Sequence, residues 1–111
     1  MSKPEKASSL YGTLDLLALK SLSLEPLHGV GVMQRIEQIT SGSVRVSYGS
    51  LFPSLHRMEQ KGWLVAEWRA SDSNRRAKYY ALTAEGRKRL RLEEREWSRL
   101  VEAIATALRS T

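Results

Sequence analysis

The chain has 111 residues and carries 18 Lys plus Arg against 12 Asp plus Glu, a net charge of +6 without any cysteine. This length fits one domain and leaves no room for a separate catalytic domain, while the missing cysteines exclude disulfides and Cys-ligated zinc. No apolar run approaches the roughly 18 residues of a membrane span, and the polar start is no signal peptide, so we expect a cytoplasmic protein without membrane contact. The basic charge favours a polyanionic partner such as nucleic acid or anionic lipid.

Apolar residues in the first part of the chain recur three or four positions apart, which is the spacing of a helix with one buried side. This pattern predicts a first helix over residues 10–24 and a second over residues 30–39. Pro26 separates the two, because proline cannot continue a helix. Residues 1–9 are rich in Ser and Lys, and we expect them to form a flexible arm.

A third helix is predicted from Ser47 to Lys61, with Ser47 as its N-cap and Gly62 as its end. The apolar residues of this helix follow i, i+4, i+7 spacing and should be buried, namely Leu51, Leu55 and Met58. The remaining side chains are candidates for its outer surface: Tyr48, Ser50, Ser54, His56 and Arg57.

The period changes from helical to alternating between Trp63 and Thr83, which predicts a β-hairpin with a polar turn. We expect Trp63 and Trp68 in the core of this hairpin. A last helix should follow Thr83 as its N-cap. Its apolar stripe is formed by Leu90, Trp97, Leu100, Val101, Ile104 and Leu108. This stripe is too wide to remain in solvent, so it packs either on the chain's own first helix or, as we favour, on the same helix of a second copy.

The order of three helices, a hairpin and a long helix predicts a mainly α fold with a small β-hairpin, a winged helix-turn-helix with a C-terminal dimerisation helix. Residues 10–83 would form the DNA-binding domain and residues 84–111 the dimerisation helix. In such a domain the third helix enters the major groove and the hairpin lies against the DNA backbone. Residues 69–91 hold eight basic and two acidic residues. This charge suits phosphate contacts, although an ordinary solvated run of charges is the alternative.

No nucleophile and base pair, glycine-rich phosphate loop or metal-ligand spacing occurs in the sequence. We therefore expect neither an enzyme nor a bound cofactor or metal. Two other functions stay open beside DNA binding. The chain could be a small-molecule sensor of the multidrug type with a pocket at its dimer interface, or a winged-helix module that binds another protein.

Four motifs of this chain resemble the PadR family of bacterial transcriptional regulators. They are GTLDLL over residues 12–17, PLHG over residues 26–29, GSLFPSLHRMEQKGW over residues 49–63 and NRRAKYYALTAEG over residues 74–86. The last two together are highly specific. The resemblance extends from about Leu10 to Leu108 and is closest to the short branch of the family, which has a single C-terminal helix.

The resemblance implies a homodimeric winged-helix repressor whose last helix forms much of the dimer interface. We expect it to bind an imperfect palindrome in double-stranded DNA, and release by an aromatic small-molecule effector stays open. It implies third-helix contacts from Ser47, Tyr48, Ser50, Phe52 and their neighbours, and wing contacts from Arg75, Arg76 and Lys78. Phe52 and Val30 depart from the family, which commonly has tyrosine and an aromatic residue at these places. In some members a tryptophan at the dimer interface stacks on flat aromatic ligands, and Trp97 is the candidate here.

Overall fold

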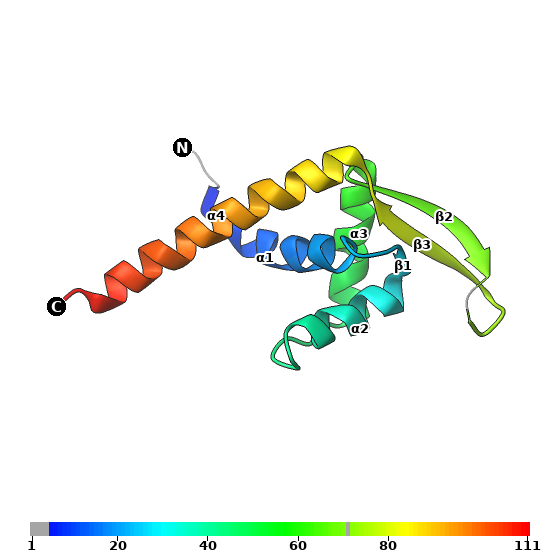
Figure 1. Ribbon diagram of the computed structural model, residues 1–111, viewed down its shortest axis with the longest axis horizontal. Coiled ribbons are helices and arrows are strands. Elements are labelled where there is room, and N and C mark those ends of the chain that lie inside the picture. The colour runs from blue at the N-terminus through cyan, green and yellow to red at the C-terminus, as the bar shows by residue number, and fades with distance from the viewer. Residues whose placement is uncertain (1–4, 71) are drawn as a thin grey trace.

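The computed structural model describes residues 5–70 and 72–111. The elements in this part of the chain are α1 (Glu5–Ser21), β1 (Leu27–His28), α2 (Gly29–Ile39), α3 (Tyr48–Gln60), β2 (Leu64–Ala70), β3 (Arg76–Leu82) and α4 (Ala84–Arg109). In Figure 1, α1 lies between α4 and α2, the hairpin extends to one side, and the C-terminal part of α4 extends to the other. The predicted mainly helical fold with a small antiparallel sheet is confirmed. Over the described residues, no helix combines the length and apolar character that crossing a membrane requires.

Helix α1 begins at Glu5, five residues before the predicted start at Leu10. Residues 5–9 of the expected arm lie within this helix, and residues 1–4 lie outside the described residues. This first turn contains Glu, Lys and Ala, which have high helix propensity but give no apolar pattern that would reveal a helix. At the other end, the helix stops at Ser21, whose hydroxyl donates to the Leu17 carbonyl at 2.8 Å.

The sheet has three antiparallel strands in the order β1-β3-β2. Strand β1 was not predicted, because two residues are too short to show an alternating pattern. It places Leu27 opposite Tyr80, and Ala66 of β2 lies on the other side of the same Tyr80. The sheet thereby gives the hairpin a third strand at its base, next to the N-terminus of α2.

The core is formed by apolar residues of all four helices and of the base of the sheet. Its buried members are Ala18, Leu19, Leu22, Val32, Ile36, Leu51, Leu55, Met58, Leu64, Tyr80 and Leu90. The predicted burial of the three apolar residues of α3 is confirmed. Burial raises the pKa of the Tyr80 phenol. Leu90 is only 8% exposed, so its predicted place in a dimer interface was wrong: the first turns of α4 pack on the chain's own core.

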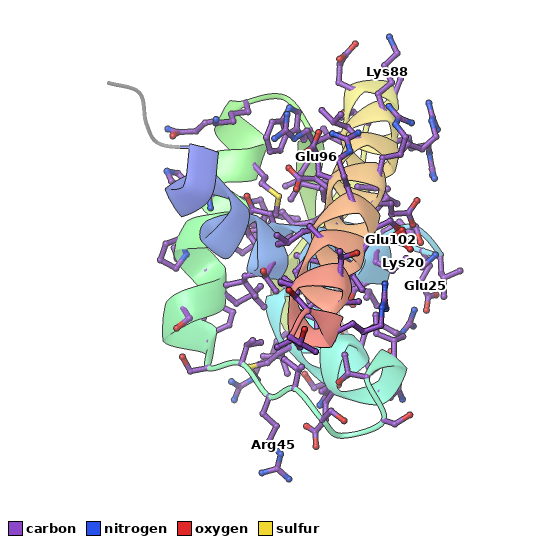
Figure 2. All side chains as sticks on the ribbon, turned by 90° about the vertical axis from the view of Figure 1, so that its left-hand side faces the viewer. Lys20, Glu25, Arg45, Lys88, Glu96 and Glu102 are labelled. Atoms are coloured by element: carbon purple, nitrogen blue, oxygen red, sulfur yellow. The ribbon has the colours of Figure 1, made fainter. Side chains whose placement is uncertain are left out.

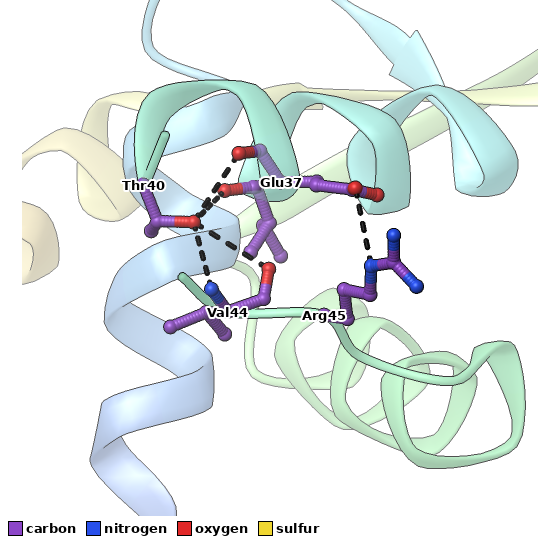
Figure 3. Close-up of polar contacts among 5 residues, drawn as sticks. Glu37, Thr40, Val44 and Arg45 are labelled. Atoms are coloured by element: carbon purple, nitrogen blue, oxygen red, sulfur yellow. Dashed lines mark hydrogen bonds and ion pairs between the residues drawn. The ribbon is translucent and has the colours of Figure 1, made fainter. Parts of the chain in front are cut away.

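The connection from α2 to α3 is held by the Thr40 side chain (Figure 3). Its hydroxyl donates to the Ile36 carbonyl at 2.8 Å and accepts from the Val44 N–H at 3.1 Å. Arg45 in the same loop donates to the Glu37 carboxylate at 3.2 Å. These contacts fix the loop that leads into α3, so α2 and α3 have a defined mutual orientation.

The junction between the hairpin and α4 depends on Gly86. The Thr83 side chain caps α4 by accepting from the Gly86 N–H at 3.0 Å, which confirms the predicted N-cap. The Thr83 hydroxyl also donates to the Gly62 carbonyl at 2.7 Å. A β-carbon at position 86 would overlap the carbonyl oxygen of Trp63. Glycine therefore allows the start of α4 to touch the backbone that connects α3 to the hairpin.

Candidate nucleic-acid interface

The N-terminus of α3 is exposed and begins where the sequence predicts. Ser47 has extended backbone angles, and its hydroxyl oxygen accepts from the Ser50 N–H at 3.1 Å, which confirms Ser47 as the N-cap. Residues 47–50 are all exposed and, apart from Tyr48, are small. Free N–H groups at a helix N-terminus favour an anion, and small side chains allow a phosphate to approach the backbone.

Three aromatic side chains follow one another along the exposed side of α3. Tyr48, Phe52 and His56 are four residues apart, and we call them the aromatic ridge. The ring centroids of Tyr48 and Phe52 are 5.7 Å apart, and those of Phe52 and His56 are 6.3 Å apart. Tyr48 is 43% and Phe52 42% exposed. The ridge is therefore a largely apolar surface on the outside of the helix that the sequence assigns to DNA.

Two of the predicted outer residues of α3 face α1 instead. Ser54 is 3% exposed, and its hydroxyl donates to Oδ1 of Asp15 at 2.5 Å. The predicted place of Ser54 on the outer surface was therefore wrong, because position 54 falls within the helical arc that Leu51 and Met58 bury. Arg57 donates to both oxygens of Asp15, at 2.9 and 3.0 Å, and this carboxylate raises the pKa of Arg57. Its guanidinium is thus engaged within the chain.

A second ion pair joins α3 to the wing, the name we give to β2, β3 and the turn between them. The Lys78 ammonium lies 3.0 Å from Oε1 of Glu59, and this carboxylate raises the pKa of Lys78. Lys78 was predicted to contact DNA; in this structure Glu59 balances its charge and holds β3 against α3. Helix α3 is therefore positioned from two sides, by Asp15 of α1 and by Lys78 of the wing.

The outer part of the wing carries positive charge without acidic partners. Arg75 and Arg76 are exposed, and neither has a carboxylate partner among residues 5–70 and 72–111. The Arg76 guanidinium lies over the Trp68 ring, 5.7 Å from its centroid. Asn74 adopts a positive φ of 63° in the turn, a conformation that asparagine tolerates well. Both arginines are thus free to contact phosphate.

A hollow of about 630 Å³ lies between the wing and the N-termini of α2 and α3. Its apolar lining includes Val30, Tyr48, Phe52 and Trp68, and its basic lining is Arg75, Arg76 and Lys78. The hollow brings together the first two rings of the aromatic ridge, Tyr48 and Phe52, and the wing arginines, which are far apart in sequence. Tyr48 packs so closely on Gly29 that a β-carbon there would lie 2.5 Å from its ring. Gly29 therefore sets the position of the first ring of the ridge.

Trp68 was predicted in the hairpin core but is 57% exposed, so this expectation was wrong. Its side chain shares a strand face with the buried Leu64, and its register partner is Lys78. The hairpin extends past the helical body, so a residue on the core side of β2 reaches solvent near the tip. Trp63, by contrast, is half-buried beneath Lys61 and Arg89 at the base of the wing.

The other exposed apolar surface lies on α4. Four predicted interface residues are between 36% and 48% exposed, and Leu108 is 81% exposed; the four are Trp97, Leu100, Val101 and Ile104. We call these five residues the α4 stripe. The N-terminal half of α4 packs on α1, whereas its C-terminal part extends beyond the body of the molecule (Figure 1). The described part of this chain thus leaves the stripe without a cover.

A groove of about 470 Å³ runs between α1 and α4. Its apolar lining comes from Leu16 of α1 and from Leu92, Trp97 and Leu100 of α4. Figure 2 looks along α4 from its C-terminal end, with the charged side chains of Lys88, Glu96 and Glu102 on the same helix. Trp97 belongs to the α4 stripe and also lines this groove. This position fits either packing against a second copy or contact with a ligand.

The described residues hold no cluster of three or more His, Asp or Glu side chains able to bind a metal ion. Arg45 is one basic residue that reasoning from sequence passed over. Its side chain is 79% exposed and points away from the molecule in Figure 2, two residues before the N-cap of α3. A lone arginine in a polar loop gives no pattern in the sequence, so only the structure reveals its position.

Comparison with known proteins identifies the relatives of this chain. Residues 16–92 match the model of the transcriptional regulator PadR-like family. A transcriptional regulator of Mycobacterium tuberculosis is 36% identical over 78 residues, which cover 70% of this chain and 69% of that protein.

Solved structures agree with this match. A PadR family regulator from Eggerthella lenta is 29% identical, with a TM-score of 0.77 over 96% of this chain and 91% of its own. A PadR family regulator from Clostridium difficile is 26% identical, with a TM-score of 0.71 over 86% of this chain and 97% of its own. Members of this family are transcriptional regulators and not enzymes; they bind DNA and typically act as dimers. The chain belongs to the PadR-like family of transcriptional regulators.

Proposed function

We propose that this regulator is a homodimeric repressor that binds an imperfect palindrome in double-stranded DNA. The observation that carries the proposal is the hollow where the exposed N-terminal half of α3 meets Arg75 and Arg76 of the wing. A helix that enters the major groove and a basic hairpin beside it would contact one stretch of duplex together. Repression follows if that stretch overlaps a promoter.

The two elements would have different tasks. On α3, Tyr48, Ser50, Phe52 and His56 are exposed and would face base edges. Ser47 and the N–H groups behind it would meet a phosphate, and so would Arg75 and Arg76. Phosphate contacts supply affinity for any sequence, whereas base contacts supply specificity. Lys78 and Arg57 would mainly support the reading surface, since acidic residues of the same chain hold both.

A second copy of the chain would cover the α4 stripe. In a symmetric dimer the same surface of both copies packs together, and apolar side chains spaced three or four residues apart suit the pairing of two helices. Two copies of α3 would then lie at half-sites about one turn of duplex apart, which explains why a palindrome is expected.

Effector binding is a second function that the groove between α1 and α4 favours. Trp97 at this groove offers an indole face on which a flat aromatic compound could stack. Titration of such compounds while tryptophan fluorescence is recorded tests this function, with Trp97→Phe as the variant and Trp63→Phe as its control. Quenching that persists in the Trp97 variant would contradict binding at this tryptophan.

The repressor proposal is tested by transcription in vitro. A promoter that carries the site selected by the protein from random duplexes should lose transcripts as protein is added, at two chains per site. The same promoter with a scrambled site is the control. Unchanged or increased transcription at saturating protein would contradict repression, and one chain per site would contradict the dimer.

A further inference from the structure

We propose that the aromatic ridge of Tyr48, Phe52 and His56 reads the 5-methyl groups of thymines in the major groove. This inference rests on the proposed function, because it names the feature of DNA that α3 recognises. It assigns the base contacts to apolar surface rather than to a set of paired hydrogen bonds.

The residue types in the first turns of α3 exclude paired hydrogen bonds to bases and leave apolar contact as the main way to recognise them. From Ser47 to His56 the chain contains no Arg, Lys, Asn, Gln, Asp or Glu. The paired hydrogen bonds that identify guanine come from Arg or Lys, and those that identify adenine come from Asn or Gln. The next residue, Arg57, is held by both oxygens of Asp15. This half of the helix can therefore offer single hydrogen bonds from hydroxyls and His56, and apolar contact with thymine methyl groups.

The ridge has the exposure that such contacts require. Phe52 is the most apolar side chain of the ridge, yet it is 42% exposed. Packing in the core of this chain therefore does not explain why a phenylalanine occupies this position. Gly49 is exposed as well, and among the described residues outside its chain neighbours and its own helix backbone only the Ser47 hydroxyl oxygen would lie within 4 Å of a β-carbon at this position. The helix backbone beside the ridge is thus open to close approach by the groove.

The spacing of the rings limits where the methyl groups must lie. Neighbouring centroids of the ridge are 5.7 and 6.3 Å apart, and stacked bases rise by about 3.4 Å per step. The three rings therefore span about three to four base-pair steps. The thymines that matter should fall within one short run in each half-site.

Charge around the ridge favours DNA as its occupant over another protein. The hollow beside the ridge is lined by Arg75, Arg76 and Lys78, and within the described part of the chain only Lys78 of these three has an acidic partner. A polyanion would satisfy the two free arginines while its apolar methyl groups cover the ridge. A protein partner would need both an apolar and an acidic surface there, and it remains an outcome of the test.

Uracil scanning tests the proposal without any change to the protein. The site selected from random duplexes is resynthesised with each thymine replaced by uracil, which removes only the methyl group. Affinity should fall about fourfold for each methyl group that the ridge covers, the factor expected for burial of one such group. The sensitive positions should lie within one run of about four base pairs per half-site. The proposal would be overturned if no replacement of a thymine lowered the affinity, or if the half-sites of the selected duplex contained no thymine.

Phe52→Ala then assigns the effect to the ridge. This variant should bind the thymine duplex as weakly as the uracil duplex at one position, so that the fourfold difference disappears there. Leu24→Ala is the matched control, since Leu24 is 72% exposed and lies outside the ridge and the wing. If Phe52→Ala keeps full DNA affinity and full sensitivity to uracil, Phe52 does not read the methyl groups and the proposal is overturned, which leaves a protein partner as the alternative occupant of the ridge. If no site is selected by the wild-type protein at all, the proposed function itself has failed, whatever the ridge does.

Discussion

Arg57 of α3 donates two hydrogen bonds to the carboxylate of Asp15 in α1, and Ser54 donates a third to the same carboxylate. Asp15 is 7% exposed, so this carboxylate needs its partners. We predict that Asp15→Asn lowers the free energy of unfolding by about 1.5–3 kcal/mol, the range for hydrogen bonds to charged groups. Ser54→Ala removes one hydrogen bond to this charged carboxylate and should cost about 1.5 kcal/mol, the lower end of the same range. Urea unfolding followed by circular dichroism measures both.

An exposed ion pair provides the control for this network. Glu37→Gln removes the partner of Arg45, whose side chain is 79% exposed, and should change stability by less than about 1 kcal/mol. Equal losses for Asp15→Asn and Glu37→Gln would show that the Asp15 network does not hold α3. A loss of unfolding free energy in the Asp15 variant alone would indicate that α1 holds α3 in place through Asp15.

The wing arginines should set the salt dependence of DNA binding. Arg75→Ala combined with Arg76→Ala should weaken binding to all sequences alike, and the slope of log K against log salt should fall by about 2. Fluorescence anisotropy at several salt concentrations measures this slope. Arg109→Ala, at the end of α4 opposite the wing, removes one positive charge far from the wing and should leave the slope unchanged. A double variant that keeps the wild-type slope would place the phosphate contacts elsewhere.

The α4 stripe should hold the dimer together. We predict that Ile104→Glu yields monomers, because a charge would be buried between two apolar helices, and that affinity for a two-half-site duplex falls by at least tenfold. Thr106→Glu adds the same charge one turn or less away and should stay dimeric, since Thr106 is not part of the stripe. Sedimentation equilibrium distinguishes the two. A dimeric Ile104→Glu protein would exclude this surface as the interface.

Gly86 should tolerate no side chain. Gly86→Ala places a methyl group on the Trp63 carbonyl oxygen, and relief of this overlap should cost about 1–3 kcal/mol or more of stability. Gly49→Ala is the matched substitution in open surroundings, and it should raise helix stability by up to about 1 kcal/mol. Thermal unfolding compares them. Equal stability of the two variants would mean that the α4 junction can shift to make room.

The sequence was sufficient for the elements that carry regular patterns. The N-caps Ser47 and Thr83 and the burial of Leu51, Leu55 and Met58 follow from local rules, and the structure confirms them. Ser54 could not be placed in this way, because its burial depends on Asp15, which is 39 residues away in sequence. A count of apolar spacing ignores a buried serine.

Leu90 and Trp68 show that an apolar pattern alone also does not tell whether a residue lies in the core of its own chain. Leu90 lies on the same side of α4 as the stripe, seven residues before Trp97, but it packs on the core of its own chain. Trp68 continues the pattern of β2, but the wing extends beyond the helices at this point. The point at which a continuous apolar pattern leaves the core depends on the lengths of neighbouring elements, which a periodicity does not contain.

We expect two copies of α3 to read a palindromic duplex while the two wings contact its backbone. Selection of bound sequences from a random duplex pool, repeated at two salt concentrations, tests this arrangement as a whole. One inverted repeat with half-sites about one turn apart should be enriched and bound with a steep salt dependence. Enrichment of a single half-site without a repeat, or of no sequence at all at either salt concentration, would contradict it.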